Sequence, residues 1–344
     1  MSTASNGSPL INAYAAFEPG GELKPFTYDP GELPADQVEI DVLYCGLCHS
    51  DLSVINDDWG LSQYPVVPGH EVVGRIGRLG SQVSHLAVGQ AVGLGWHCGY
   101  CNHCHCCNSG DQNLCAQAQA TIIGHHGGFA DKVRAAAASV VPIPESIDLA
   151  TAGPLFCAGI TVFNPLVQFA VNPDSRVAVI GIGGLGHLAL QFLRAWGCEV
   201  TAFTSSESKR QEAMDLGAHY TLNSRGPAAL EEAAGRFDVI LSTVNVRLDW
   251  NQYLSTLRAR GRLHLVGATT DPLDISAFQL IFGQRQVSGS PVGSPDTMAR
   301  MLEFAARHRI LPVVERFPMS EVNRALEKLA SGEVRYRVVL EGGR

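Results

Sequence analysis

The sequence predicts an α/β protein in which a β-rich domain precedes a doubly wound parallel sheet. Short alternating strands separated by turn residues fill the region from residue 10 to 150, for example over 38–44, 72–78 and 128–133. From about Thr151, strand and helix patterns alternate instead, which is typical of a parallel sheet covered by helices. A chain of 344 residues is long enough for two such domains.

A glycine motif joins the first strand and helix of the second domain. A strand pattern over 176–180 leads into Gly181, Gly183 and Gly186, which stand at G-x-G-x-x-G spacing, and a helical pattern follows over 184–196. Gly181 permits a tight turn, Gly183 lets backbone N–H groups approach a pyrophosphate, and Gly186 lets the helix pack close to the strand. The sequence therefore predicts a dinucleotide-binding unit.

The alternation continues after this unit and then gives way to a tail. We expect the tail, after about Pro291, to fold back onto the first domain. The expected strands span residues 199–203, 237–243, 262–267 and 335–340, and the expected helices span 248–260, 296–308 and 320–330.

Charge and composition exclude several classes of partner. The net charge of -8 argues against nucleic acid and anionic membranes, because both require a basic face. The apolar window 177–196 contains the glycine turn and three polar side chains, so a membrane span is not expected there. Nothing at the start resembles a signal peptide, and ten cysteines then indicate reduced thiols and metal ligation in a cytoplasmic protein. We expect a small-molecule substrate.

The loop over residues 98–115 is the densest metal-ligating stretch. Four of its cysteines stand at C-x2-C-x2-C-x7-C, and four thiolates suit a closed tetrahedral zinc. A ferredoxin-type cluster would need a further cysteine followed by proline soon after the third, and a nucleic-acid-binding zinc ribbon would need a second cysteine pair. Other ligand registers stay open, because Cys98, Cys106 and three histidines lie in or beside the loop. The expected ligands are Cys101, Cys104, Cys107 and Cys115.

A second set of metal-ligating residues is scattered through the chain. It comprises Cys48, His70, Glu71 and Cys157. Ligands of a site assembled in a cleft are scattered in this way, but a lone buried histidine or cysteine is more often a core residue. The residues by themselves leave a second metal site open.

Five motifs in order resemble those of zinc-dependent medium-chain dehydrogenases: CGLCHSD at 45–51, PGHEVVG at 68–74, the four-cysteine loop, LFCAGITVF at 155–163 and GIGGLG at 181–186. DLSVINDDWGLSQYPVVPGHE and VRYRVVL are most similar to the cinnamyl alcohol dehydrogenase branch and to bacterial broad-specificity NADPH-dependent aldehyde reductases. The resemblance implies reversible hydride transfer between alcohol and aldehyde. It also implies a GroES-like catalytic domain over 1–153 and 291–344, with a Rossmann domain over 154–290.

The resemblance also implies two zinc ions per chain and assigns their ligands. The four-cysteine loop would hold a structural zinc, and Cys48, His70 and Cys157 would hold a catalytic one, with Glu71 taking its fourth position transiently. Asp51 would accept the free N–H of the His70 imidazole. Ser50 would protonate the substrate oxygen, but Ser53 stands where relatives carry the histidine that continues the proton relay, so the length of this relay is open.

Cofactor choice depends on the residues about 20 positions past the glycines, where NAD enzymes place an acidic residue. Here the chain has serines followed by Lys209 and Arg210, which favour the 2′-phosphate of NADP(H); a solvated helix face is the alternative. Glu207 is interpreted as a residue of the first helical turn. The expected cofactor contacts are Ser50, Thr161, Gly181, Ile182, Gly183, Gly184, Leu185, Gly186, Thr204, Ser205, Ser206, Lys209, Arg210, Thr243, Gly267, Ser290 and Val292.

Apolar residues are expected at the mouth of the substrate cleft, which would accept aliphatic and aromatic aldehydes alike. The resemblance also implies a homodimer joined near Gln286 to Ser290. Two alternatives to an NADPH-dependent aldehyde reductase stay open. One is an NAD-dependent alcohol or polyol dehydrogenase. The other is a non-catalytic zinc-storing or redox-sensing protein, which is suggested by four cysteines without an assigned role: Cys45, Cys98, Cys106 and Cys198. The expected pocket residues are Trp59, Leu61, Trp96, Pro291 and Val292; core packing is the alternative for the two tryptophans.

Overall fold

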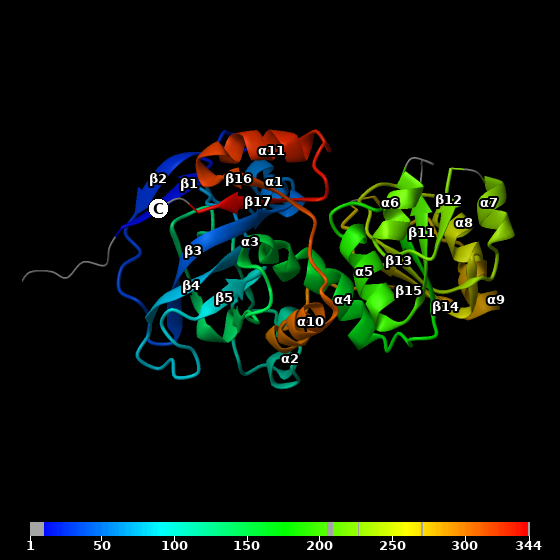
Figure 1. The fold of residues 1–344 in the computed structure, drawn as a ribbon, viewed down its shortest axis with the longest axis horizontal. Helices are drawn as coiled ribbons and strands as arrows, with labels where there is room; N and C mark the ends of the chain where they lie inside the picture. The colour runs from blue at the N-terminus through cyan, green and yellow to red at the C-terminus, as the bar shows by residue number, and fades with distance from the viewer. Residues whose placement is uncertain (1–9, 205–208, 226, 270, 343–344) are drawn as a thin grey trace, which may run out of the picture. The chain divides into compact units, whose positions relative to one another are not determined.

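The structure is a computed structural model that describes residues 10–204, 209–225, 227–269 and 271–342. Its chain forms two compact units (Figure 1). The first unit comprises residues 1–157, 293–306 and 311–344, and the second comprises 158–292 and 307–310. The predicted fold class, a β-rich domain combined with a doubly wound parallel sheet, is confirmed.

A seven-stranded sheet forms the core of the first unit. Its longest strand, β3 (Gln37–Leu47), pairs antiparallel with β4 (Glu71–Leu79), β8 (Lys132–Ala136) and β17 (Arg337–Glu341). The strand order is β16-β17-β3-β4-β5-β9, so the end of the chain lies in the same sheet as β3. The other bounds are β5 Ala91–Leu94, β9 Val140–Pro142 and β16 Val314–Pro318.

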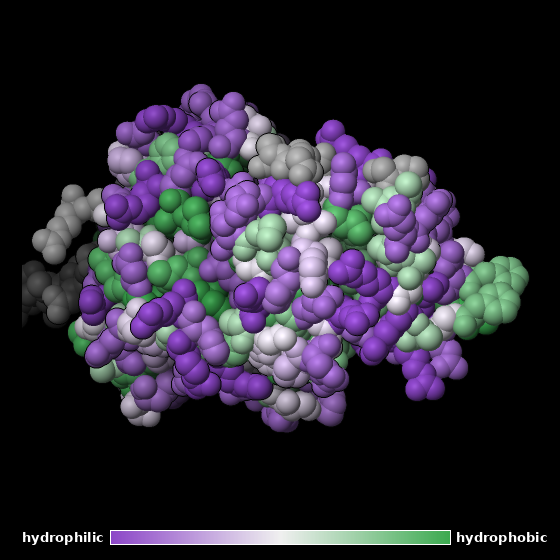
Figure 2. Space-filling view, turned by 45° about the vertical axis from the view of Figure 1, so that its right-hand side comes forward, coloured by the Kyte–Doolittle hydropathy of each residue, from purple (hydrophilic) through white to green (hydrophobic). Residues whose placement is uncertain are grey.

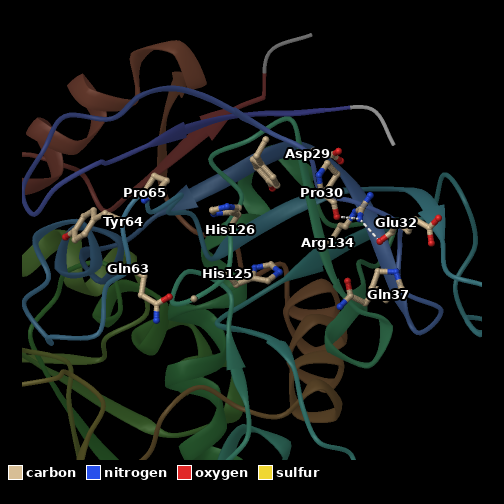
Figure 3. Close-up of a pocket in the computed structure, with 13 residues that line it drawn as sticks. Asp29, Pro30, Glu32, Gln37, Gln63, Tyr64, Pro65, His125, His126 and Arg134 are labelled. Atoms are coloured by element: carbon tan, nitrogen blue, oxygen red, sulfur yellow. Dashed lines mark hydrogen bonds between the residues drawn. The ribbon is translucent and has the colours of Figure 1, made fainter. Parts of the chain in front are cut away.

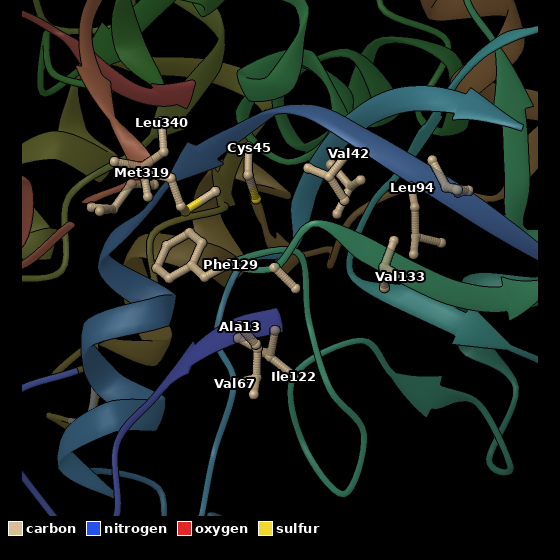
Figure 4. Packing of buried hydrophobic residues seen from close by; sticks show 14 of the residues in the cluster. Ala13, Val42, Cys45, Val67, Leu94, Ile122, Phe129, Val133, Met319 and Leu340 are labelled. Carbon is tan, nitrogen blue, oxygen red and sulfur yellow. The ribbon is translucent and has the colours of Figure 1, made fainter. Parts of the chain in front are cut away.

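The apolar core of this unit lies against one face of the sheet. Phe129, Leu340 and Cys45 are fully buried there and pack together (Figure 4). The remaining elements of the unit surround this core. They are β1 Ile11–Ala15, β2 Lys24–Tyr28, α1 His49–Asn56, β6 His97–Gly99, α2 His105–Asn108, β7 Gln119–Ala120, α3 Leu149–Ala152, α10 Pro295–His308 and α11 Val322–Ala330, with short 3-10 helices at Gln112–Leu114, Ala137–Ser139, Gly153–Phe156 and Met319–Glu321.

The second unit contains a six-stranded sheet in which all pairs are parallel. Its order, β12-β11-β10-β13-β14-β15, is the one that dinucleotide-binding folds use. The central strand β10 is a nearly continuous apolar run, RVAVI, and four of its five residues are buried, as expected for a strand of a parallel sheet that helices cover. Their bounds are β10 Arg176–Ile180, β11 Glu199–Thr204, β12 Tyr220–Asn223, β13 Phe237–Ser242, β14 Leu257–Leu265 and β15 Gln286–Gly289; the helices are α4 Ala158–Gln168, α5 Gly186–Trp196, α6 Arg210–Asp215, α7 Pro227–Glu232, α8 Trp250–Ser255 and α9 Ala277–Gly283.

One predicted helix is too long. The helix expected over 248–260 ends at Ser255, and β14 begins two residues later at Leu257. Leu257 pairs with Phe237, and after a bulge Arg262 pairs with Val239. Arg260 adopts the left-handed conformation within this bulge, at φ 64°. Sheet pairing therefore overrides the helical pattern of the sequence.

No single helix among the described residues has the length and apolarity needed to cross a membrane. One bent pair, Leu149–Phe156 with Ala158–Gln168, passes this test by length and composition only.

Candidate active site

The four scattered ligand candidates meet in the first unit. Cys48 precedes α1, and Cys157 follows the 3-10 helix Gly153–Phe156. Glu71 is the first residue of β4, and His70 directly precedes it. One ligand atom from each of the four lies within 4.8 Å of the others. The sulfurs of Cys48 and Cys157 are 4.0 Å apart. Four ligands around zinc, with Zn–S near 2.3 Å, would place sulfurs about 3.8 Å apart, so this arrangement fits a zinc ion.

Asp51 determines how the His70 ring is presented. Its Oδ1 lies 2.9 Å from His70 Nδ1 and also accepts the backbone N–H of Gly69 at 2.9 Å. Its Oδ2 accepts the N–H of Cys48 at 2.9 Å, which caps α1. Nδ1 therefore carries the proton toward Asp51, and Nε2 presents its lone pair. This Nε2 is buried and has no hydrogen-bond partner among the described residues, as expected for an atom that ligates a metal.

The two thiols of this cluster compete for protons. The hydrogen bond to Cys157 lowers the pKa of Cys48 well below its usual range, and the same contact raises the pKa of Cys157. Two buried thiolates this close require a cation between them to ionise together. The chemistry of the pair therefore also fits a divalent metal.

Arg337, which was not among the site residues predicted from the sequence, is the partner of Glu71. Its guanidinium contacts Glu71 Oε1, and both side chains are buried. Burial raises the pKa of Glu71, and Arg337 opposes that shift. Glu71 Oε2 finds no partner in the part of the chain that the structure describes. A Cβ at Gly46, the residue opposite in β3, would stand 1.9 Å from this oxygen, so only glycine fits there.

The four predicted cysteines of the 98–115 loop also come together. The sulfur of Cys101 is 3.8 Å from that of Cys107 and 3.6 Å from that of Cys115. Backbone hydrogen bonds reach these sulfurs: one from His103, and a second from Cys104 N to Cys101 Sγ at 3.3 Å, lower the pKa of Cys101 to about 6. Cys98 Sγ instead contacts the carbonyl of Ala120 at 3.5 Å, outside the cluster. The geometry fits a closed tetrahedral zinc site.

The glycine turn of the second unit lies at the carboxyl ends of its strands. Gly181 has φ 85°, and a Cβ at Gly186 would stand 1.9 Å from the Gly181 carbonyl oxygen. Thr243 Oγ1 donates to that same carbonyl at 2.7 Å and thereby holds the turn. A Cβ at Gly183 would meet nothing within 4 Å, so space is open beside the turn. Ile182, Gly184 and Leu185 complete the turn.

The other expected cofactor residues that the structure describes in the second unit lie on several elements. Thr204 is buried at the end of β11, and a Cβ at Gly267 would stand 2.1 Å from the Val244 carbonyl oxygen. Lys209 and Arg210 are exposed at the start of α6. Ser205, Ser206 and Glu207 lie outside the described residues. Thr161 is buried on α4, Ser290 follows β15, and the carbonyl of Val292 accepts from Asn164 at 3.5 Å.

Comparison with known proteins decides the family. Residues 34–145 match the alcohol dehydrogenase GroES-like domain, and residues 184–307 match the zinc-binding dehydrogenase domain. The chain is 61% identical to the aldehyde reductase AdhA of Synechocystis over 331 residues, which cover 96% of this chain and 98% of the relative.

The protein is a member of the zinc-dependent medium-chain alcohol dehydrogenase family, in its cinnamyl alcohol dehydrogenase branch. The resemblance found in the sequence is thereby confirmed. A cinnamyl alcohol dehydrogenase from Sorghum bicolor superposes with a TM-score of 0.92 at 37% identity, covering 97% of this chain and 98% of that one. The cinnamyl alcohol dehydrogenase of Helicobacter pylori complexed with NADP(H) gives a TM-score of 0.88 at 29% identity over 96% and 98%.

The predicted pocket residues of this dehydrogenase divide between the two units. In the first unit, the Trp96 ring lies edge-on to His70 at 5.1 Å and to Trp59 at 5.9 Å. Trp59 is 37% exposed and Leu61 is 55% exposed, so neither is a core residue. Pro291 and Val292 belong to the second unit. Trp96 therefore packs against His70, and the more exposed Trp59 packs against Trp96.

Ser50 and Ser53 both lie on α1 and are half-buried. Ser50 Oγ is 3.8 Å from Cys48 Sγ, which places this hydroxyl beside the cluster of candidate ligands. The three-residue spacing puts Ser53 on the same face of the helix, one turn further on.

A cavity of about 590 Å³ lies elsewhere in the first unit. It runs from Gln63 and Tyr64 past His125 and His126 to Arg134 (Figure 3). Its described lining includes no residue of either ligand cluster. Arg134 is held there by Glu39 at 2.9 Å and by the carbonyl of Pro30 at 2.8 Å, which gives it a structural role.

Proposed function

We propose that this alcohol dehydrogenase works mainly as a reductase that converts a broad range of aldehydes to primary alcohols with NADPH. The observation that carries this proposal is the cluster of Cys48, His70 and Cys157, in which the Nε2 of His70 is buried and without a partner among the described residues. Two thiolates and one imidazole leave a fourth position for the substrate oxygen, the arrangement that the open zinc sites of this class use. The family establishes the coarser activity, oxidoreduction between alcohols and aldehydes.

The domain boundaries predicted from the sequence, 1–153 with 291–344 and 154–290, form part of this proposal. So do two zinc ions per chain, one in each ligand cluster. We assign the catalytic ion to Cys48, His70 and Cys157, with Glu71 nearby, and the structural ion to the four-cysteine loop.

Each residue around the catalytic cluster then has a defined task. A zinc ion held there would supply a Lewis acid that polarises the aldehyde oxygen. Asp51 keeps the His70 ring in the tautomer that presents Nε2. Arg337 neutralises Glu71 and holds it beside the cluster. Ser50 donates the proton that the reduced oxygen requires, and Trp59 and Trp96 present an apolar surface that does not discriminate strongly among aldehydes.

Substitution of Ser50 by alanine should reduce kcat by roughly 100- to 10,000-fold, the usual cost of removing a positioned proton donor. Ser53→Ala is the matched control, because it removes the same group one turn further along α1 and should cost far less. Steady-state kinetics of both variants decide the point. Equal losses would show that the proton relay runs through Ser53.

We infer a preference for NADPH from the start of α6. Lys209 and Arg210 are exposed there, one strand away from the glycine turn, and they can attract a 2′-phosphate. In the sequence, the position where NAD enzymes carry an acidic residue has serines instead. The related Helicobacter pylori enzyme has been found complexed with NADP(H).

The ratio of kcat/KM for NADPH over NADH should be at least about 10, which corresponds to about 1.4 kcal/mol. Lys209→Ala and Arg210→Ala should each lower this ratio, whereas Arg300→Ala, which removes an exposed cation from a helix of the first unit, should leave it unchanged. Equal use of the two cofactors by the wild-type enzyme would refute the preference and favour an NAD-dependent alcohol or polyol dehydrogenase.

We also propose a homodimer joined along β15. This strand is at the edge of its sheet, and α9 directly precedes it. Phe278, Ile281 and Phe282 of α9 are 68%, 68% and 83% exposed, and an apolar cluster projects at the right-hand edge of Figure 2, on the side where Figure 1 places α9. Exposed apolar patches of this kind commonly mark interfaces. Sedimentation velocity should give the mass of two chains; a monomer at micromolar concentration would contradict this assembly.

The alternative of a zinc-storing or redox-sensing protein is less well supported. Among the four cysteines that suggested it, Cys45 and Cys198 are buried, and burial raises the pKa of both thiols. Buried thiols of high pKa react slowly with oxidants.

A further inference from the structure

A buried histidine of the second unit links two hydroxyl groups on the edge strand. His264 lies on β14 and is 1% exposed. Its Nδ1 is 2.9 Å from Ser288 Oγ, and its Nε2 is 2.9 Å from Ser290 Oγ. The ring packs on Phe169, with centroids 4.8 Å apart. Both nitrogens are therefore used, and both partners lie on or just after β15.

The environment of His264 makes its ring neutral at pH 7. Burial, together with the nearby Arg262, lowers the pKa of His264 to about 4. A neutral imidazole donates one hydrogen bond and accepts one, so the two serines must play opposite roles.

Arg262 supplies a third group to this chain of hydrogen bonds. Its Nη1 lies 3.4 Å from Ser288 Oγ and can only donate, so the Ser288 oxygen accepts there. We assign the tautomer in which Ser288 donates to Nδ1 of His264 and Nε2–H donates to Ser290, because it is the one in which all three hydrogen bonds of the chain run in the same direction. Hydrogen bonds that run in one direction reinforce one another. The hydroxyl proton of Ser290 is thereby directed away from the histidine.

Ser290 lies at the edge of the sheet where dinucleotides bind in folds of this kind. It follows the carboxyl end of β15, and its N–H donates to the Leu265 carbonyl at the end of β14. In open α/β sheets, ligands bind beyond the carboxyl ends of the strands, with one half of a dinucleotide on each side of the central strand. Lys209, on the 2′-phosphate side, follows β11, whereas β15 lies on the opposite side of β10. Ser290 therefore faces the nicotinamide half.

We propose that His264 is a positioning residue that holds Ser290 as a hydrogen-bond donor to the carboxamide of the nicotinamide. The chain Arg262–Ser288–His264–Ser290 sets the direction of that donor. This inference rests on the proposed NADP(H) function, and it predicts that the contribution of His264 is confined to the nicotinamide half of the cofactor.

Isothermal titration with two ligands tests this confinement. NADP⁺ carries both halves, whereas 2′,5′-ADP carries only the adenosine half. Ser290→Ala and His264→Leu should each weaken NADP⁺ binding roughly five- to tenfold, the range expected for one lost hydrogen bond, and leave 2′,5′-ADP binding unchanged. The double variant should bind NADP⁺ no more weakly than the weaker single variant, because both remove the same interaction.

His264→Gln separates positioning from packing. Glutamine can accept from Ser288 and donate to Ser290, so this variant should recover part of the NADP⁺ affinity that His264→Leu loses. If His264→Leu fails to fold, Ser288→Ala takes its place, since it breaks the same chain one step earlier and should also weaken only NADP⁺.

The failure of this inference can be distinguished from the failure of the proposed function. Equal weakening of both ligands by His264→Leu, or Ser290→Ala with unchanged NADP⁺ affinity, would overturn the inference and leave the proposed function standing. A wild-type protein that binds neither ligand would contradict the proposed NADP(H) function itself.

Discussion

Cys157→Ser should lower turnover at least about 10,000-fold while the protein stays folded. In the proposed open site Cys157 is one of three protein ligands, and its sulfur lies 4.0 Å from that of Cys48. Such a site contributes several kcal/mol to the transition state through Lewis acidity, and each 1.36 kcal/mol is a factor of ten in rate. Steady-state aldehyde reduction, circular dichroism and metal content should be measured together, and the variant should hold one zinc ion fewer per chain.

Cys198→Ser is the control for this substitution. Cys198 is a buried thiol of the second unit, remote in sequence from both ligand clusters, and its sulfur contacts the Asn172 carbonyl at 3.5 Å. Its replacement should leave both the rate and the metal content near wild-type values. An undiminished rate for Cys157→Ser, with two zinc ions retained, would remove Cys157 from the catalytic site.

Cys104→Ser should act on stability instead. Cys104 caps the short helix α2 by accepting the N–H of Cys107, and its sulfur belongs to the closed four-cysteine cluster. Closed sites contribute their metal-binding energy to folding, so we expect the free energy of unfolding to fall by about 4 kcal/mol or more. Urea unfolding followed by circular dichroism measures this loss, and a zinc chelator should reproduce it with the wild-type protein.

Cys106→Ser provides the matched control, since Cys106 lies in the same helix but outside the cluster. It should unfold at nearly the wild-type urea concentration. Equal destabilisation by the two substitutions would mean that the loop depends on its packing rather than on a metal.

The sequence predicted those parts of the enzyme whose conformation is set by residues close together in the chain. The spacing of Gly181, Gly183 and Gly186 predicted a strand, a turn and a helix, because each glycine answers a constraint within a few residues. The cysteine spacing predicted the four loop cysteines that come together, Cys101, Cys104, Cys107 and Cys115, but left other ligand registers open. The direction of each sulfur decides that, and Cys98 turns toward the Ala120 carbonyl instead.

Long-range pairing accounts for what the sequence could not show. Arg337 contacts Glu71 across 266 residues of chain, and the only local sign of this contact is an arginine at the start of a strand whose next three residues are apolar. The helix expected over 248–260 was too long for the same reason, because β13 draws Leu257 into the sheet. The hydrogen bond between His264 and Ser290 also forms because β14 and β15 are neighbours in the sheet, and the sequence pattern does not show which strands are neighbours.

The most direct test of the central claim is NADPH consumption by the zinc-loaded wild-type protein with a panel of aliphatic and aromatic aldehydes, run beside Cys157→Ser. We expect several aldehydes of both classes to be reduced to primary alcohols by the wild-type protein, with the variant close to background. A wild-type protein that oxidises no NADPH with any aldehyde, or a variant that reduces them equally well, would contradict a zinc-dependent aldehyde reductase.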